Sequence, residues 1–170
     1  MSTPAVRLVE IPPEAMRALV EGDLDRASAL TGTPLSPYLA SDACTWLWRI
    51  RLEQGERDPA SRPWFARAAV AEPDGPVVGH AGFHGKPDES GMVEVGYTVD
   101  PAYRRRGYAR AMVRALLDRA ASEDGVTRVR ASISPYNEAS LATIRGFGFE
   151  PVGEQWDDED GLEIIYEVTV

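Results

Sequence analysis

The chain has 170 residues and a formal net charge of -9, with 44% apolar and 26% charged residues. This composition is typical of a globular protein and excludes collagen-like and disordered chains. The acidic charge argues against a nucleic-acid partner, because nucleic-acid phosphates require a basic surface.

The length and the residue types favour one domain over residues 1–170, since a chain of this size can bury a core without cross-links. The sequence has no segment of the kind that directs export, and its apolar runs are too short to span a membrane. A single cysteine, Cys44, permits neither an internal disulfide nor a zinc cluster. We therefore expect a cytoplasmic protein without a membrane partner or a bound metal.

The first part of the chain is expected to hold one strand and two helices. Residues 6–11 read as a strand that two prolines end, and a helix follows over 14–22. A second helix is expected over 41–54. We expect its tryptophans, Trp46 and Trp48, to pack in the core or in a lid. An acceptor wall and a dimer contact stay open as further roles for this aromatic segment.

From residue 64 onward the pattern changes to strands. Residues 64–71 and 76–85 flank a Glu-Pro-Asp-Gly turn and predict a hairpin. The next strand, 92–99, alternates in polarity. Its odd-numbered residues from Val93 to Val99 are apolar and are expected on the core side, which leaves Glu94 on the opposite face.

The last part of the chain alternates helices and strands. Apolar residues from Ala109 to Ala120 are spaced as one stripe of a helix, and Gly125 is expected to end that segment. A strand over 127–133 and a helix opened by Asn137 follow, and the chain closes with a hairpin over 150–170. This order favours a mixed sheet with helices packed on it.

Three arginines precede a glycine where the stripe-bearing helix begins, in the segment Asp-Pro-Ala-Tyr-Arg-Arg-Arg-Gly-Tyr-Ala, residues 100–109. The N–H groups of a first helical turn lack intrahelical partners and carry the positive end of the helix dipole. Gly107 permits close approach to the backbone, and the arginines add charge. The segment therefore predicts an anion site, although the three glycines of a dinucleotide fingerprint and the lysine of a P-loop are lacking.

The same segment resembles the acetyl-CoA motif of the GNAT N-acetyltransferases, with Arg104 three residues before Gly107 and Ala109 two after it. The resemblance extends over the strand, loop and helix from 93 to 117, and to a second motif, Asn-Glu-Ala-Ser-Leu-Ala-Thr-Ile-Arg-Gly-Phe-Gly-Phe. It covers about residues 64–170. The Asn137-x-x-Ser140 spacing is similar to the Rim-type branch, which includes N-terminal acetyltransferases of ribosomal proteins.

The resemblance implies an α/β fold with a mixed, twisted sheet of six to seven strands and helices on both sides. Its central strands should splay near Val99 and Ile133 to admit acetyl-CoA. Loop N–H groups would bind the pyrophosphate, strand backbone would pair with the pantetheine arm, and Ser140 would face the sulfur. The residues implied in acetyl-CoA binding are Thr98, Val99, Arg104, Arg105, Arg106, Gly107, Tyr108, Ala109, Asn137 and Ser140.

A lysine-like amine, with a pKa near ~10.4, must lose its proton before it attacks a thioester. Glu94 is the candidate general base because it lies on the strand next to the cofactor, on the polar face of that strand. His84 is the second choice for this role, whereas His80 is expected to be structural.

The acid that protonates the leaving thiolate is missing from its usual place. Many family members carry a tyrosine seven residues after the motif asparagine, where this chain has Ile144. Ser140 is the second residue to which we assign a catalytic role. Tyr136 is a further candidate acid, and unassisted departure of the thiolate stays open.

The expected function is transfer of an acetyl group from acetyl-CoA to a primary amine of a small molecule or a protein N-terminus. Acidic segments at 88–91 and 157–161 favour a cationic acceptor. Two alternatives stay open: transfer of a longer acyl group such as succinyl, and a non-catalytic acyl-CoA-binding or regulatory domain. The sequence is compatible with a monomer or a homodimer.

Overall fold

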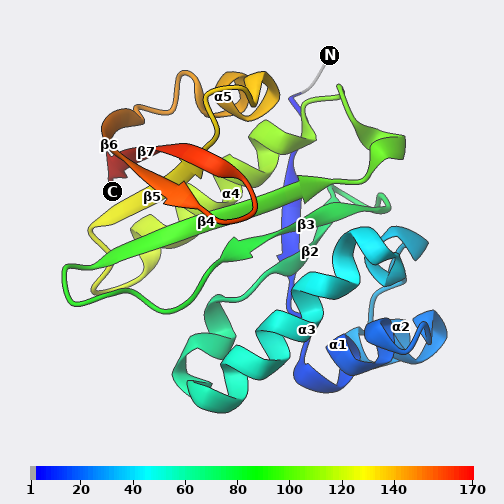
Figure 1. Cartoon of the computed structure of the whole chain (residues 1–170). Coiled ribbons are helices and arrows are strands. Elements are labelled where there is room, and N and C mark those ends of the chain that lie inside the picture. Colours follow the sequence, from blue (N-terminus) through cyan, green and yellow to red (C-terminus); the bar gives the residue numbers. More distant parts are fainter. Residues whose placement is uncertain (1–2) are drawn as a thin grey trace.

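The computed structural model describes residues 3–170. Its centre is a seven-stranded sheet with the strand order β1-β2-β3-β4-β5-β7-β6. Figure 1 shows how strands β2 to β7 lie in this sheet. The strands are β1 (Val6–Val9), β2 (Arg67–Ala71), β3 (Val77–Phe83), β4 (Met92–Val99), β5 (Arg128–Ile133), β6 (Glu150–Asp157) and β7 (Gly161–Thr169).

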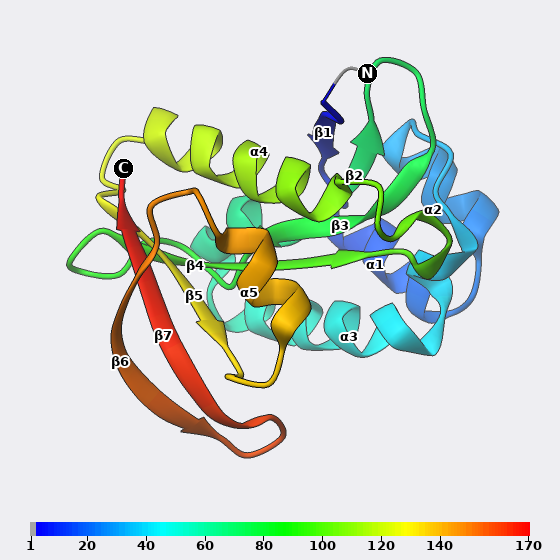
Figure 2. The ribbon, with the colours of Figure 1, turned by 90° about the horizontal axis from the view of Figure 1, so that it is seen from above.

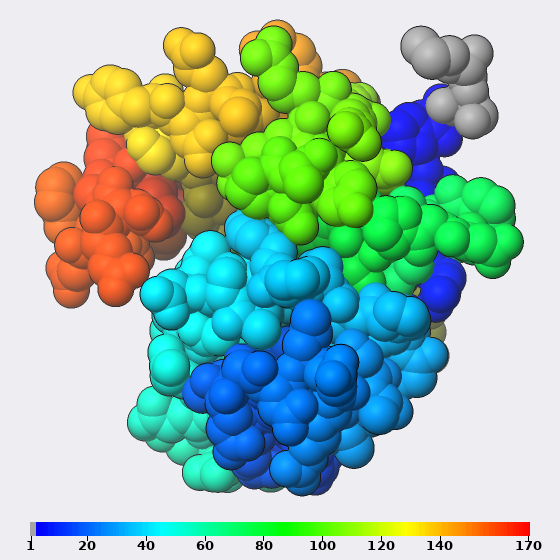
Figure 3. Space-filling model, turned by 90° about the vertical axis from the view of Figure 1, so that its right-hand side faces the viewer, coloured from blue at the N-terminus to red at the C-terminus, as the bar shows by residue number. Residues whose placement is uncertain are grey.

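Helices cover both faces of this sheet, and each face has its own apolar core. Figure 2 shows α4 and α3 on opposite sides of the β3–β4 pair. Figure 3 shows the first helical layer, blue to cyan, below the green segment that contains residues 100–109, here called the arginine loop. The helices are α1 (Pro13–Val20), α2 (Leu24–Thr31), α3 (Asp42–Arg57), α4 (Tyr108–Ser122) and α5 (Glu138–Ile144), with short 3-10 turns η1 (Pro37–Ala40), η2 (Pro59–Trp64) and η3 (Pro101–Tyr103).

The sheet opens at its centre, between β4 and β5. These two strands run parallel, and they pair only from Met92 to Glu94 on β4 and from Arg128 to Arg130 on β5. Beyond that point β4 continues along β3 to Val99, while β5 continues along β7 to Ile133. The expected α/β fold, with a mixed seven-stranded sheet and a splayed central pair, is confirmed.

The structure differs from the expected elements in two places. Helix α2 was not predicted, because it is short and buries Ala27 as its one core residue. Its ends nevertheless carry ordinary signals, since Asp23 accepts a hydrogen bond from the Arg26 N–H and Gly32 is left-handed. The strand expected from residue 64 begins at Arg67, because the segment before it is wound into the proline-containing η2.

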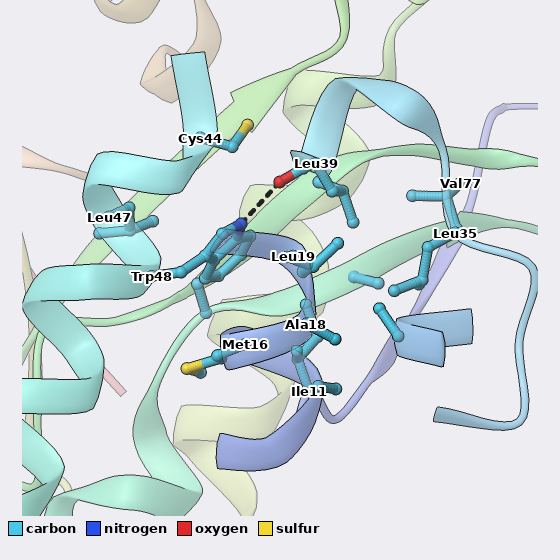
Figure 4. Packing of buried hydrophobic residues seen from close by; sticks show 14 of the residues in the cluster. Ile11, Met16, Ala18, Leu19, Leu35, Leu39, Cys44, Leu47, Trp48 and Val77 are labelled. Atoms are coloured by element: carbon cyan, nitrogen blue, oxygen red, sulfur yellow. Dashed lines mark hydrogen bonds between the residues drawn. The ribbon is translucent and has the colours of Figure 1, made fainter. Parts of the chain in front are cut away.

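The two tryptophans of α3 have different surroundings. Trp48 is fully buried, and its Nε1–H donates a hydrogen bond of 2.7 Å to the Leu39 carbonyl, as Figure 4 shows. Trp46 is 52% exposed, and its Nε1–H donates to the Ala43 carbonyl of its own helix. The core role expected for these residues is therefore confirmed for Trp48, while Trp46 presents its ring to the surface.

His80 is a core residue, as expected. It lies on β3 with 5% exposure, and its ring meets the Trp48 ring edge-on with centroids 5.4 Å apart. Burial, followed by the charge of Arg51, lowers the pKa of His80 to about 4. A neutral imidazole is therefore part of the packing between α3 and the sheet.

This buried neutral imidazole makes stability depend on pH. The unfolded chain takes up the His80 proton near pH ~6.5, whereas the folded chain resists it until about pH 4. The stabilisation is complete above the unfolded pKa and is lost as the pH falls towards the folded pKa. We expect urea titrations to show that the free energy of unfolding falls by about 3 kcal/mol between the unfolded and the folded pKa of His80.

His80→Phe should remove this part of the pH dependence, and His84→Gln, at a half-exposed position, should retain it. Equal pH dependence in the wild type and in His80→Phe would contradict the assignment.

Candidate active site

The backbone of the arginine loop contains two left-handed residues. Asp100 begins it, accepting a hydrogen bond of 2.9 Å from the Ala102 N–H. Arg105 has φ 62° and Gly107 has φ 87°, and such left-handed residues turn successive N–H groups toward one side. A Cβ on Gly107 would lie 3.1 Å from Pro4 Cγ, so both the conformation and the space favour glycine.

The N–H groups of this loop are available to a ligand. Across residues 3–170, the backbone N–H groups of 105–109 find no backbone acceptor. The first intrahelical bond in this stretch comes from Ala111, which donates to the Gly107 carbonyl at 3.1 Å. Free N–H donors, the helix dipole and the positive charge of the arginines are features that favour an anion at this loop.

The free edge of β4 offers a second set of backbone groups. Even-numbered residues face β3, because Glu94 accepts from the His84 N–H and the Asp100 N–H donates to Val78. The Thr98 carbonyl also faces β3, since a Cβ on Gly79 would lie 2.0 Å from it. Beyond the paired segment, the odd-numbered residues therefore direct their backbone groups into the opening. The backbone of Thr98, which was expected to pair with the pantetheine arm, is therefore turned toward β3, whereas the backbone groups of Tyr97 and Val99 face the opening.

Helix α5 forms the wall opposite the arginine loop. The Asn137 side chain caps this helix, and its Oδ1 accepts a hydrogen bond of 3.1 Å from the Ser140 N–H. Arg110 of α4 holds the end of α5, because its Nη1 donates to the carbonyls of Thr143 and Arg145 at 3.0 and 2.7 Å. This clamp, which the sequence pattern did not indicate, fixes the distance between the two helices.

Between these walls lies a cleft of about 490 Å³, here called the loop cleft. It brings together eight of the ten residues expected to bind acetyl-CoA; Arg106 and Asn137 border it without lining it. Arg106 instead lies over the Tyr103 ring, 5.7 Å from its centroid. The lining residues are Tyr97, Thr98, Val99, Tyr103, Arg104, Arg105, Gly107, Tyr108, Ala109, Arg110, Ala139, Ser140, Ala142 and Thr143.

A second cleft of about 390 Å³, here called the hairpin cleft, opens on the other side of β4. It shares two residues with the loop cleft, Tyr97 and Ser140. The two clefts therefore meet at these side chains. Its lining residues are Trp46, His84, Glu94, Val95, Gly96, Tyr97, Ala131, Ser132, Ile133, Ser140, Gln155, Asp157, Asp160 and Glu163.

Glu94 and His84, the two candidate bases, are in contact inside the hairpin cleft. His84 Nδ1 lies 3.1 Å from Glu94 Oε2, and the Glu94 side chain is 22% exposed. The neighbouring strands produce this contact, since the backbone of His84 bonds that of Glu94. A Cβ on Gly96 would lie 3.1 Å from His84 Nε2, so the glycine leaves room for the imidazole above β4.

The β6–β7 turn gives the hairpin cleft an acidic rim. Asp157 Oδ1 accepts hydrogen bonds of 2.8 Å from the N–H groups of Glu159 and Asp160. The Asp160 N–H and then the Glu159 N–H lower the pKa of Asp157, which keeps this carboxylate charged. By contrast, Asp88 of the other acidic segment holds the turn before β4 and lines neither cleft.

The residues considered for thiolate protonation lie in different places. Ile144 is 5% exposed and belongs to the core of the α4–α5 face. Tyr136 is 89% exposed and lines neither cleft. Tyr97, which sequence analysis treated as a core residue, lies instead where the clefts meet. The alternation of polar and apolar residues in β4 places Tyr97 in the apolar row and therefore predicted a core position.

Comparison with known proteins agrees with this geometry. The family model for the acetyltransferase (GNAT) domain matches residues 11–150. An L-2,4-diaminobutyric acid acetyltransferase of Nocardia farcinica is 34% identical over 153 residues, covering 84% of this chain and 75% of that protein. An uncharacterized N-acetyltransferase of Bacillus subtilis is 37% identical over 73 residues. The match covers 43% of this chain and 44% of that relative, so the matched part of the chain spans less than half the length of the relative.

Solved structures share the fold over nearly the whole chain. A ribosomal-protein-S5-alanine acetyltransferase of Vibrio fischeri has a TM-score of 0.63 at 19% identity, covering 99% of this chain and 94% of that one. The aminoglycoside acetyltransferase AAC(6')-Ib, in complex with acetyl-CoA, has a TM-score of 0.61 at 15% identity over 99% and 94%. These likenesses show the shared fold. With the family model matching most of its length, the chain belongs to the GNAT acetyltransferase family.

Proposed function

We propose that the protein transfers an acetyl group from acetyl-CoA to a primary amine, and that the amine attacks the thioester directly. The observation that carries this proposal is the pair of clefts that meet across β4. One cleft offers anion-binding N–H groups, and the other contains a carboxylate–imidazole pair with an acidic rim. The likeness to a diaminobutyric acid acetyltransferase supports an amine as the acceptor.

The residues of the loop cleft suit acetyl-CoA. Five free N–H groups at 105–109 would bind the pyrophosphate, with charge added by the arginines beside them. The odd-numbered backbone groups of β4 would pair with the pantetheine arm as an added strand would. Acetyl-CoA supplies the acetyl group as an activated thioester. The Val99 N–H, which faces the opening, is the donor placed to polarise its carbonyl.

The hairpin cleft suits a cationic acceptor. Asp157, Asp160 and Glu163 line it from the β6–β7 hairpin, and the exposed ring of Trp46 borders it from α3. Carboxylates attract an ammonium group, and an aromatic face adds a cation–π contribution. A polyamine, an amino sugar, a diamino acid and a protein N-terminus all carry the required charge.

Glu94 and His84 would remove the proton that makes the amine a nucleophile. An ordinary alkylammonium group has a pKa near ~10.4, so about one molecule in 10³ is neutral at pH 7. Glu94 accepts this proton directly or through His84, which its carboxylate holds in place. A longer acyl donor such as succinyl-CoA would need further donors near the thioester.

Gly107→Glu tests the loop as the pyrophosphate site. The change adds a negative charge and a side chain to the loop that carries the free N–H groups, at a residue with φ 87°. We expect the affinity for acetyl-CoA to fall at least about 100-fold, equivalent to losing two charge-assisted hydrogen bonds. Isothermal titration calorimetry measures this loss.

Gly125→Glu is the matched control, because Gly125 has φ 86°, open space around it and a position outside the loop cleft. The control carries the same new charge and similar backbone strain. Equal losses of affinity in both variants would contradict the loop assignment.

Glu94→Gln tests the base. It keeps the shape of the side chain and removes the proton acceptor, so kcat at pH 7 should fall about 100-fold or more. The loss should shrink at alkaline pH, where more of the amine is already neutral. The Kd of acetyl-CoA should stay within about twofold, since the side chain lies outside the loop cleft.

Glu154→Gln, on an exposed edge-strand carboxylate outside both clefts, serves as the control. Wild-type kcat in Glu94→Gln at every pH would remove Glu94 from the mechanism.

A further inference from the structure

The position of Tyr97 and Ser140 between the clefts bears on how the leaving sulfur is stabilised. These are the residues that line both the loop cleft and the hairpin cleft. In the proposed reaction the acetyl group passes from the first cleft to the second. The bond between carbon and sulfur therefore breaks close to these two side chains.

The hydroxyl of Tyr97 is buried, and it finds no hydrogen-bond partner within residues 3–170. An unpaired buried hydroxyl costs free energy, about 1–3 kcal/mol, so the Tyr97 hydroxyl favours any arrangement of the cleft wall that gives it an acceptor. Burial raises the pKa of Tyr97, and the neighbouring Ser140 offsets part of that rise. The phenol therefore keeps its proton at neutral pH and remains a donor.

Ser140 is the side chain next to this donor. Its backbone is fixed, because its N–H donates to the Asn137 side chain at the start of α5. Arg110 holds the far end of the same helix against α4. Ser140 is half-buried and lines both clefts, whereas the Tyr97 hydroxyl is covered. A ligand in the loop cleft can therefore contact Ser140, whereas the Tyr97 hydroxyl is covered.

We propose that Tyr97 and Ser140 form a chain of two hydroxyl groups that stabilises the departing sulfur of acetyl-CoA. Ser140 O–H donates to the sulfur, and Tyr97 O–H donates to Ser140 Oγ. Tyr97 is a positioning residue, since it acts through Ser140. The chain takes the place of the tyrosine that Ile144 replaces, and it rests on the proposed acetyl transfer.

The balance of the step needs no further reactant. When the carbon–sulfur bond breaks, its electron pair stays on sulfur, and the two hydroxyl groups stabilise the resulting thiolate by hydrogen bonds. The proton lost by the amine passes through Glu94 and His84 to water. The thiolate takes a proton from water as CoA leaves. Each donor strengthens the other, because polarising the Ser140 hydroxyl makes it a better donor.

The first measurement needs no turnover. The pKa of the thiol of bound CoA is read from the ultraviolet absorption of its thiolate, as the difference between complexes with CoA and with desulfo-CoA. Donors to the sulfur lower this pKa, so Tyr97→Phe should raise it by about one unit. Other titratable groups of the clefts, including His84, Glu94 and Tyr108, are the same in both proteins and cancel.

The second measurement is a double-mutant cycle on kcat. Tyr97→Phe and Ser140→Ala should each lower kcat at least tenfold, while KM for acetyl-CoA stays within about twofold. The double variant should be no slower than Ser140→Ala, because residues that act as one unit lose their effect together. Tyr166→Phe, at a partly buried tyrosine on the same side of the sheet, is the control and should match the wild type.

Three results separate the possibilities. An unchanged thiol pKa in Tyr97→Phe, or losses of kcat that multiply in the double variant, would overturn the hydroxyl chain while leaving acetyl transfer intact. Wild-type protein that binds CoA but releases no thiol with any amine would instead overturn the proposed function.

Discussion

The separation of β4 from β5 is the constraint on which the rest of the molecule depends. Two parallel strands pair over three residues each and then diverge, although each remains paired on its other side. Backbone groups along the inner edge of β4 are left without a strand partner. Such groups require hydrogen bonds, and an extended, amide-bearing ligand can supply them. The opening thus leaves an edge of β4 to which such a ligand could bind.

Everything around the opening matches a ligand with a charged end and a reactive end. The arginine loop turns its free N–H groups toward one end of β4, and α5 closes the opposite wall through the Arg110 clamp. On the far side of the sheet, the β3–β4 register brings His84 against Glu94. One strand therefore has backbone groups that face the opening on its edge and the Glu94 carboxylate on its face.

Much of this architecture could be predicted from local sequence. The alternation in 92–99 and the apolar stripe of α4 identified their elements, because burial on one face leaves a periodic pattern. The loop was identified by Gly107 and its arginines, whose effect is local. Helix α2 was missed because it buries so little that it leaves hardly any pattern.

Contacts between distant segments lay beyond sequence reasoning. The Glu94–His84 pair depends on strand register. The Arg110 clamp joins Arg110 to two residues that follow it by 33 and 35 positions in the sequence. The backbone direction of Thr98 depends on which residues of β4 bond β3, which composition does not determine. Tyr97 belongs to an apolar row by pattern, and its position between the clefts follows from the place of α5 across the opening.

The most direct test of the account is calorimetric titration of the wild-type protein with acetyl-CoA, with ADP as the comparison ligand. ADP carries the pyrophosphate but lacks the pantetheine arm and the thioester. If the free edge of β4 and the arginine loop bind one ligand together, acetyl-CoA will bind one-to-one and much more tightly than ADP. No binding, or equal affinity for ADP, would mean that the loop is a general phosphate site and would contradict the account.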